Sequence, residues 1–201
     1  MNSGEQNLRG FVLFGFKDPS GKVVIPCEWN YASKFQEGLA AVKDSDGKWG
    51  FIDETGDIVI PCKWERAHDF CEELAGVQDA NGKWGFVDHS GNVILPCQWN
   101  CVGDFCEGLA AAVDSTGKTG FISRTGKVMI PYIWRRSFGN FRKGIVAVQD
   151  CTSHKWGFID CSGKIVMPCR WDCIRLCNDG NVQVRTENHG EWHYIDNMDK
   201  V

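Results

Sequence analysis

The sequence predicts an all-β protein made of tandem repeats of about 35 residues, each a three-stranded antiparallel meander, stacked as a curved open array. Three observations predict this fold. The string DGKWGFIDETGDIVIPCKW, which begins at Asp46, returns as NGKWGFVDHSGNVILPCQW from Asn81. A proline closes an apolar run at an almost constant spacing. The apolar runs are short, β-branched or aromatic, and bounded by turn residues. We expect one repeat domain over residues 1–201, with about five repeats and partial units at the ends.

The spacing of the repeat is read from its prolines, which are separated by 35, 35, 35 and 37 residues. A tryptophan follows each proline by three positions, and in four copies an aromatic residue follows by nine or ten; Cys177 takes its place in the last copy. Because the same residue types return at the same offsets, each copy meets the same packing problem against its neighbours. The prolines are Pro26, Pro61, Pro96, Pro131 and Pro168.

Each copy predicts three strands in a fixed order. The first is the small-residue stretch EGLAAV at Glu37 in the first copy, and a polar Gly-containing turn leads from it into the next strand. The second is KWGFID, in which Trp, Phe and Asp alternate with Gly and Ile, as on the two faces of a strand. The third is the apolar run before the proline, which removes a ladder donor and is expected to end the strand. DETGD at Asp53 predicts a type I turn followed by a left-handed Gly.

A ten-residue connection with its Trp and Phe is expected to join one meander to the next. A single meander cannot bury its own faces, whereas stacked copies can, with the aromatic pair of each connection wedged between neighbours. Burial of one such side chain contributes about 1.5 to 3 kcal/mol. An open array needs only atypical end units, and we favour it. The alternative is a closed, propeller-like ring, for which small GLAAV residues suit a crowded inner strand.

The pattern KWGFID..G.VVIP..W....F.EGLAAV resembles the WG β-repeat family, also described as KWG repeats. The resemblance covers about residues 10 to 196 and departs from the family at Thr119, which replaces the signature Trp, and at His193, which replaces the signature Gly. It implies a tandem repeat architecture of the kind found in many bacterial proteins and presumed to mediate interactions. It implies no catalytic residues.

Composition narrows the function classes. A net charge of -4 gives no overall attraction to nucleic acid or to an anionic membrane, and favours a basic or extended protein as partner. No apolar run approaches the length that spans a bilayer, and the N-terminal MNSGEQNLRG lacks an export signal. We therefore expect a cytoplasmic protein. Eleven cysteines are an odd number in a long chain, so reduced thiols are favoured over a disulfide framework.

Candidate reactive residues are better explained by structure than by chemistry. A cysteine follows the proline in four of the five copies, at Cys27, Cys62, Cys97 and Cys169, and PCRWDCIRLC adds Cys173 and Cys177 to the last of these, but no fourth ligand for zinc is evident. His189 and His193 are four apart on a predicted strand, about 13 Å, which is too far to share an ion. Asp53 and its equivalents are turn formers. The basic cluster WRRSF at Trp134 is read as a solvated connection. We expect no cofactor, no metal and no enzyme activity.

Binding is expected where packing leaves residues free to vary, beside the Trp of each connection. Such a strip would let a non-enzymatic scaffold or accessory subunit hold an extended protein partner. The alternative function is a small-ligand or metal-binding β-repeat protein that uses the cysteine rows or a ring axis. In the fourth copy Ile133 directly precedes the connection Trp and belongs to the same strip. The predicted protein-binding residues are Glu28, Asn30, Lys63, Glu65, Gln98, Asn100, Arg135, Arg170 and Asp172.

Overall fold

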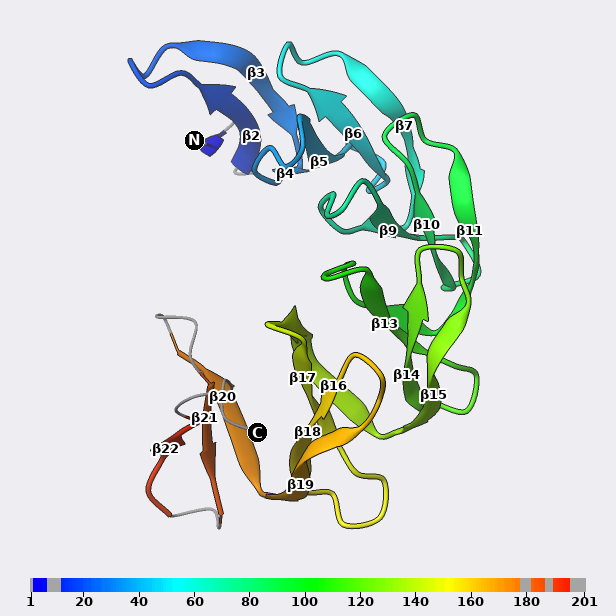
Figure 1. Ribbon diagram of the computed structural model, residues 1–201. Coiled ribbons are helices and arrows are strands. Elements are labelled where there is room, and N and C mark those ends of the chain that lie inside the picture. The colour runs from blue at the N-terminus through cyan, green and yellow to red at the C-terminus, as the bar shows by residue number, and fades with distance from the viewer. Residues whose placement is uncertain (1, 7–11, 178–181, 187–189, 196–201) are drawn as a thin grey trace. The chain divides into compact units, whose positions relative to one another are not determined.

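The computed structural model describes residues 2–6, 12–177, 182–186 and 190–195 (Figure 1). All regular elements in these ranges are β-strands, which confirms the all-β prediction. The described residues include no helix long and apolar enough to cross a bilayer. The chain divides into two compact units, Met1–Asp104 and Phe105–Val201, and each is described by itself. Whether the array is open or closes into a ring stays a prediction.

Unit 1 contains antiparallel sheets in which neighbours along the chain are neighbours in the sheet. The first sheet has the order β1-β2-β3, the second β4-β5-β6-β7 and the third β11-β10-β9-β8. The amino-terminal strand β1 was not predicted; it pairs with β2 from Asn2↔Phe16 to Gln6↔Val12. The strands are β1 (Asn2–Gln6), β2 (Val12–Lys17), β3 (Val23–Trp29), β4 (Tyr31–Ala32), β5 (Leu39–Lys43), β6 (Trp49–Asp53), β7 (Ile58–Trp64), β8 (Arg66–Ala67), β9 (Ala75–Gln78), β10 (Trp84–Val87), β11 (Val93–Trp99) and β12 (Cys101–Val102).

Unit 2 repeats the same order. A β13-β14-β15 meander is followed by the sheets β16-β17-β18-β19 and β20-β21-β22. Parts of the predicted end units, residues 8–11 and 179–181, lie outside the described residues. The strands are β13 (Leu109–Val113), β14 (Thr119–Ser123), β15 (Val128–Trp134), β16 (Arg136–Arg142), β17 (Ile145–Gln149), β18 (Trp156–Asp160), β19 (Ile165–Trp171), β20 (Cys173–Leu176), β21 (Val182–Arg185) and β22 (His193–Tyr194).

The predicted meander is confirmed, and the connection adds a strand to it. After the Trp of each connection the chain pairs with the strand that follows, as Tyr31↔Lys43 and Ala32↔Val42 show in the second sheet. In that sheet and in the third the added strand has only two residues. Such a short strand leaves no alternation in the sequence to predict it.

The prediction that proline ends the third strand is wrong. Strand β7 continues through Pro61 to Trp64, and β3, β11, β15 and β19 continue in the same way. Pairing of β6 with β7 shifts register between Trp49↔Trp64 and Phe51↔Ile60, so Pro61 lies within a bulge. The strand is also at the edge of its sheet. Both positions tolerate the missing N–H of proline.

That bulge explains the glycine of the WG pair. A Cβ on Gly50 would lie 2.5 Å from the carbonyl oxygen of Ile60 and 2.8 Å from the Sγ of Cys62. The same contacts recur at Gly157 with Met167 and Cys169. Glycine at this position therefore allows the two backbones to approach closely.

The hairpin turns follow the predicted chemistry. The N–H of Gly56, whose φ is 95°, donates to the carbonyl oxygen of Asp53 at 3.0 Å. The Asp53 carboxylate accepts from the N–H groups of Thr55 at 2.9 Å and Asp57 at 3.0 Å. These local bonds fix the loop between β6 and β7. The equivalent carboxylates that accept from backbone N–H groups two and four residues on include Asp18, Asp79, Asp88, Asp114 and Asp160.

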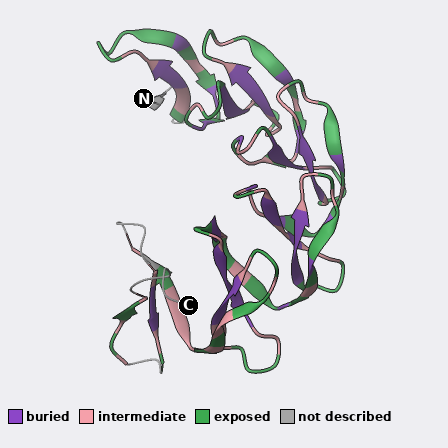
Figure 2. Ribbon diagram, viewed as in Figure 1, coloured by how far each residue is buried: buried purple, intermediate pink, exposed green. Residues whose placement is uncertain are grey.

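Neighbouring sheets of unit 1 share their cores. Phe51 packs in one cluster with Phe70 and Val77, which belong to the following repeat. The next residue, Ile52, packs in another cluster with Phe16 and Ile25 of the preceding sheet. Adjacent residues of β6 thus serve opposite neighbours, as the alternation predicts. Figure 2 shows buried residues along β6 and β10 and exposed residues along the outer strands β7 and β11.

Unit 2 repeats this packing. Phe121 of β14 and Phe141 of the next connection lie with ring centroids 5.0 Å apart, edge to face. The equivalent pair in unit 1, Phe51 and Phe70, is 4.9 Å apart. Aromatic pairs at this separation add stabilisation to that of their buried area. The prediction that connection aromatics wedge between repeats is confirmed in both units.

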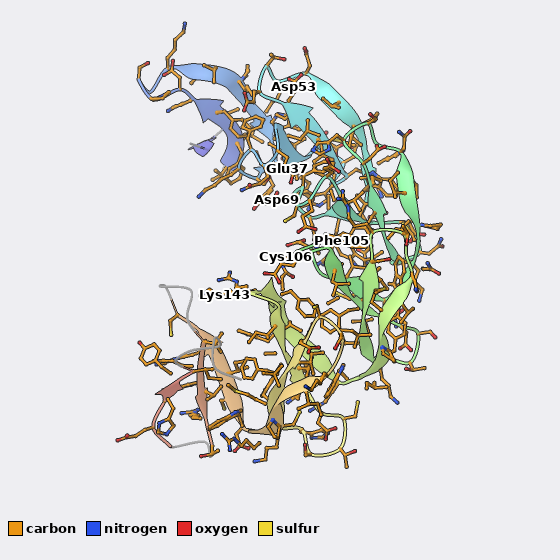
Figure 3. The ribbon with its side chains drawn as sticks, in the orientation of Figure 1. Glu37, Asp53, Asp69, Phe105, Cys106 and Lys143 are labelled. Carbon is orange, nitrogen blue, oxygen red and sulfur yellow. The ribbon has the colours of Figure 1, made fainter. Side chains whose placement is uncertain are left out.

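Turns that precede the GLAAV strands also join neighbouring repeats. The carboxylate of Glu37 accepts a hydrogen bond from the backbone N–H of Glu73 at 2.9 Å, one repeat later. In unit 2 the carboxylate of Glu107 accepts from the N–H of Gly144 at 2.7 Å. Both bonds are charge-assisted. Figure 3 labels Glu37 at its turn and Asp53 at the hairpin between β6 and β7.

Candidate functional site

The Trp that begins a central strand packs against the connection that precedes it. In the second sheet the ring of Tyr31 lies 5.1 Å from that of Trp49. In the third sheet His68 lies 4.5 Å from Trp84. These contacts line one end of the sheets with rings that remain partly accessible, since Tyr31 keeps 44% of its surface exposed. The connections therefore contribute buried core residues and also a partly accessible aromatic surface at this end of the sheets, which we call the wall.

A groove follows this wall in unit 1. It consists of two adjoining hollows of about 290 and 620 Å³, which share Trp49, Ala67 and His68. We call these two hollows the unit-1 groove. Its lining residues are Tyr31, Ser33, Lys43, Gly47, Trp49, Glu65, Arg66, Ala67, His68, Asp69, Trp84, Cys101 and Asp104.

Charges of both signs line the unit-1 groove. The smaller hollow is lined by Asp69 and Asp104, and the larger by Lys43, Arg66 and Glu65. His68 borders both, and its Nδ1 lies 2.9 Å from Oδ1 of Asp104. An aromatic floor with opposite charges along its length suits an extended polar chain with apolar side chains.

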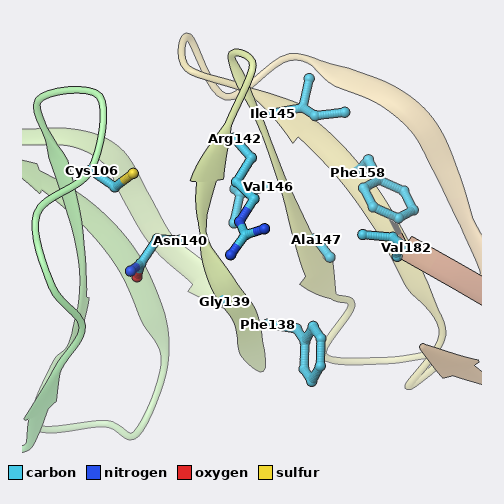
Figure 4. A pocket seen from close by; sticks show the side chains of 10 residues that line it. All are labelled: Cys106, Phe138, Gly139, Asn140, Arg142, Ile145, Val146, Ala147, Phe158 and Val182. Atoms are coloured by element: carbon cyan, nitrogen blue, oxygen red, sulfur yellow. The ribbon is translucent and has the colours of Figure 1, made fainter. Parts of the chain in front are cut away.

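A smaller and more apolar cavity lies in unit 2 (Figure 4). Its volume is about 200 Å³, and we call it the unit-2 pocket. It lies where the fourth connection is one residue longer than the others, because Phe141 follows Pro131 by ten positions. The pairing of β16 with β17 has a gap between Phe138↔Ala147 and Arg142↔Ile145, and the extra residue lies in this gap. The lining residues are Cys106, Phe138, Gly139, Asn140, Arg142, Ile145, Val146, Ala147, Phe158 and Val182.

The residues predicted for binding lie beside the connection Trp, as expected. Most of them are not among the residues that line the unit-1 groove. Glu28, Lys63, Gln98 and Arg170 are exposed next-to-last residues of the outer strands β3, β7, β11 and β19. Glu65 lines the unit-1 groove. Asn30, Asn100, Arg135 and Asp172 directly follow an outer strand, as does Glu65. Their role in binding stays a prediction.

Several of these residues already have partners within their own repeat. Glu65 forms an ion pair with Lys48. Lys155 lies 2.5 Å from Asp172, and Lys83 donates to Asn100 at 2.6 Å. In each case the lysine directly precedes the first residue of a central strand and is 17 positions before its partner. Asn30 donates instead to the carbonyl oxygen of Asp44 at 2.9 Å. The residues at this position of the repeat therefore stabilise the fold, although they differ between copies.

The titratable groups with shifted pKa values have structural roles. The Thr55 hydroxyl, which donates to Asp53 at 2.6 Å, is the main cause that lowers the pKa of that carboxyl. Burial raises the pKa of the Cys62 thiol to about 11, with a smaller contribution from Asp44. Such a thiol is protonated at neutral pH and is a poor nucleophile and metal ligand. Among the described residues, no group of three His, Cys, Asp or Glu side chains is placed to hold a metal ion.

Sequence reasoning missed most residues of the groove and the pocket. Many of them, such as Tyr31, His68 and Phe138, lie two to six positions after the connection Trp, in the part of the repeat that was expected to be irregular. One signal was available for the unit-2 pocket. The spacing of 37 in place of 35 between Pro131 and Pro168 marks a repeat with extra residues, one of them in the connection.

Comparisons with known proteins agree with the repeat architecture. A family model described as the WG containing repeat matches residues 14–49, 49–84, 84–115, 120–150 and 156–188. A search of curated proteins finds no match.

Solved structures with a similar fold share little sequence with the chain. The computationally designed Ika8 protein is 12% identical, with a TM-score of 0.56 over 96% of this chain and 67% of its own. Hsv2 from Kluyveromyces lactis is 12% identical, with a TM-score of 0.55 over 81% of this chain and 60% of its own. Hsv2 with loop 6CD replaced by a Gly-Ser linker has a TM-score of 0.56 at 12% identity, over 90% and 72%. At this identity the likeness concerns the fold alone.

Proposed function

We propose, from the premise that this chain belongs to the WG-repeat family, that it is a non-enzymatic scaffold which binds another protein through its connections. The observation that carries the proposal is the unit-1 groove, an aromatic-lined hollow that crosses two repeats. An extended segment laid along it would contact Tyr31, Trp49 and His68 in turn. Repeat proteins bind extended partners on continuous surfaces of this kind.

Variation between copies supports the same proposal. The residue four positions after the connection Trp differs in every repeat, whereas the Trp, the WG glycine and the connection Phe are nearly constant. A constant core with a changing wall allows each repeat to recognise a different side chain. The changing residues are Ser33, His68, Gly103, Phe138 and Arg175.

The chemistry of the titratable groups supports a binding role over catalysis. A general acid and base need carboxyls in distinct environments that face one cleft. Here the carboxyls with lowered pKa values accept hydrogen bonds from their own hairpins, as Asp53 and Asp160 do. We place the protein in the cytoplasm, as the sequence predicts.

Immobilised protein and an extract of the host cell test the proposal. We expect wild-type protein to retain at least one protein at near-equal amounts. The double variant Tyr31→Ala, His68→Ala should retain about fivefold less of it, because truncated aromatic contacts cost about 1 kcal/mol or more. Val59→Ala, on an outer strand, is the matched control. Equal retention by all three proteins would contradict a role for the groove.

The alternative of a metal-binding protein has a separate test. Elemental analysis of protein purified without chelator should find zinc well below one equivalent, because the described cysteines do not converge. Zinc near one equivalent would favour the alternative over the scaffold.

A further inference from the structure

The fourth repeat differs in charge from the rest of the chain. Residues 115–149 contain seven basic side chains and no acidic one, although the whole chain has a net charge of -4. A local excess of one sign attracts partners of the other sign whatever the net charge of the protein. The expectation of a basic partner, drawn from the net charge, therefore does not apply to this repeat. The seven are Lys118, Arg124, Lys127, Arg135, Arg136, Arg142 and Lys143.

The unit-2 pocket lies in this basic repeat. Its interior is apolar, with Phe158 at 2% exposure and Ile145 at 9%. Phe138 stands at its edge, 38% exposed, and its ring meets Trp156 edge to face at 6.1 Å. A cavity of about 200 Å³ has room for one large apolar side chain. Exposed apolar surface of this kind is found at binding sites.

One cation belongs to the pocket itself. The side chain of Arg142 lines it, and in Figure 4 its guanidinium end extends toward Gly139 and Asn140. Within the described part of the chain, no side-chain hydrogen bond or ion pair involves that guanidinium, which leaves its donors available. Guanidinium groups bind carboxylates through two parallel hydrogen bonds. The pocket therefore combines an apolar interior with an anion-binding edge.

We propose that the unit-2 pocket binds an acidic segment of another protein, with one large apolar side chain in the cavity and a neighbouring carboxylate on Arg142. The inference rests on the proposed scaffold function, and it adds a second site with its own partner chemistry. Charge complementarity selects the occupant: acidic residues beside the apolar anchor would lie against the segment 115–149, which has seven cations and no carboxylate.

A protein segment fits these features better than a nucleic acid does. Single strands need open aromatic platforms for successive bases and a row of cations that follows the backbone. The pocket is lined by one cation, Arg142; of its two aromatic residues, Phe158 is buried and Phe138 is already engaged by Trp156. An enclosed apolar site takes up a side chain rather than a stack of bases.

Fluorescence anisotropy with a labelled octapeptide tests the inference. The probe has one central phenylalanine among aspartates and glutamates, and a second peptide has alanine in place of the phenylalanine. We expect the alanine peptide to bind about tenfold more weakly, since it leaves the cavity unfilled. Arg142→Gln should weaken the phenylalanine peptide by about fivefold or more. Lys127→Gln, the same charge change in the same repeat but outside the pocket lining, should change the affinity by less than about twofold.

Any of the following outcomes overturns the inference. Equal effects of Arg142→Gln and Lys127→Gln, or equal affinity of the two peptides, would show attraction by net charge alone. Self-association of the protein in analytical ultracentrifugation that is lost on adding the phenylalanine peptide would make a second copy the occupant. Tighter binding of an oligothymidine that depends on Phe138 would make it a nucleic acid. Arg142 and Phe138 are exposed, so folding of Arg142→Gln and Phe138→Ala is checked by circular dichroism. The groove variant Tyr31→Ala, His68→Ala should bind the peptide normally, which separates this test from that of the proposed function.

Discussion

A methyl group on Gly50 would meet the backbone of the bulged strand β7, 2.5 Å from the oxygen of Ile60 and 2.7 Å from the nitrogen of Cys62. Gly38 is different: a Cβ there would meet nothing within 4 Å, but its φ is 84°. Glycine is therefore favoured at position 50 because a Cβ has no space there, and at position 38 because of the backbone conformation.

Replacing each glycine by alanine separates these reasons. We expect Gly50→Ala to lower the free energy of unfolding by about 2–3 kcal/mol, because the backbone of β7 must move. Gly38→Ala should cost about 1 kcal/mol from its left-handed backbone alone. Urea unfolding measures both values. Equal costs would contradict the close approach as the cause.

Glu73 holds a position that glycine holds in the equivalent turns. Its φ is 68°, and Gly38, Gly108 and Gly144 take the same place in the other copies. Because a non-glycine residue is strained there, we expect Glu73→Gly to stabilise the protein by about 0.5–1 kcal/mol. Thermal and urea unfolding check the sign. A loss of stability would show that the Glu73 side chain contributes more than its backbone strain costs.

At the scale of single elements, the hairpin turns have a predictable pH dependence. Hydrogen bonds to the Asp53 carboxylate, chiefly from Thr55, lower its pKa in the folded state. In the unfolded chain Asp titrates near about 3.9. The ionised carboxylate therefore stabilises the fold fully above that pH, and the stabilisation is lost as the pH falls through the lower folded value.

Ser123 supplies the matched variant, since it takes the place of Asp in the fourth copy and its hydroxyl lies 2.9 Å from that of Thr125. We expect Asp53→Ser to lower Tm at pH 6 and the difference from wild type to shrink below about pH 4. Calorimetry across that range measures it. A difference that does not change with pH would show that the carboxylate charge has no part in the turn.

The sequence predicted the strands and turns of each repeat because their signals are local. Alternation in KWGFID, Asp and Gly in DETGD and the aromatic spacing each depend on the period of a strand or the conformation of a turn. The prediction that the strand ends at Pro61 was wrong, because a bulge compensates for the missing N–H of the proline and leaves no mark in the sequence. The added strand at Tyr31 and Ala32 was missed because two residues show no period.

The candidate sites were less predictable than the fold. The groove depends on which connection residues meet the Trp of the following strand, as His68 meets Trp84, and such contacts are set by tertiary packing. Varying positions beside the connection Trp were identified, yet Glu65 also forms an ion pair with Lys48 within the repeat. The pocket lies where the connection has one extra residue; that spacing was visible in the sequence, but the cavity lined by Phe138, Gly139 and Arg142 was not.

For each unit as a whole, the account depends on cores shared between repeats. Phe70 lies between β8 and β9 of the third sheet, yet its ring is 4.9 Å from that of Phe51 in the second. It is 3% exposed and belongs to one cluster with Leu39 and Val77, again from the two sheets. Neither sheet can bury its inner face without the other.

Hydrogen exchange of Phe70→Ala tests this most directly. The substitution should cost about 3–5 kcal/mol, as for other buried phenylalanines. Because the ring joins two sheets, amides of β5 and β6 should lose protection together with those of β9 and β10, while Val59→Ala should leave both sheets protected. Loss of protection confined to β8–β11, with β4–β7 unchanged, would show that the repeats fold independently and would contradict the shared core.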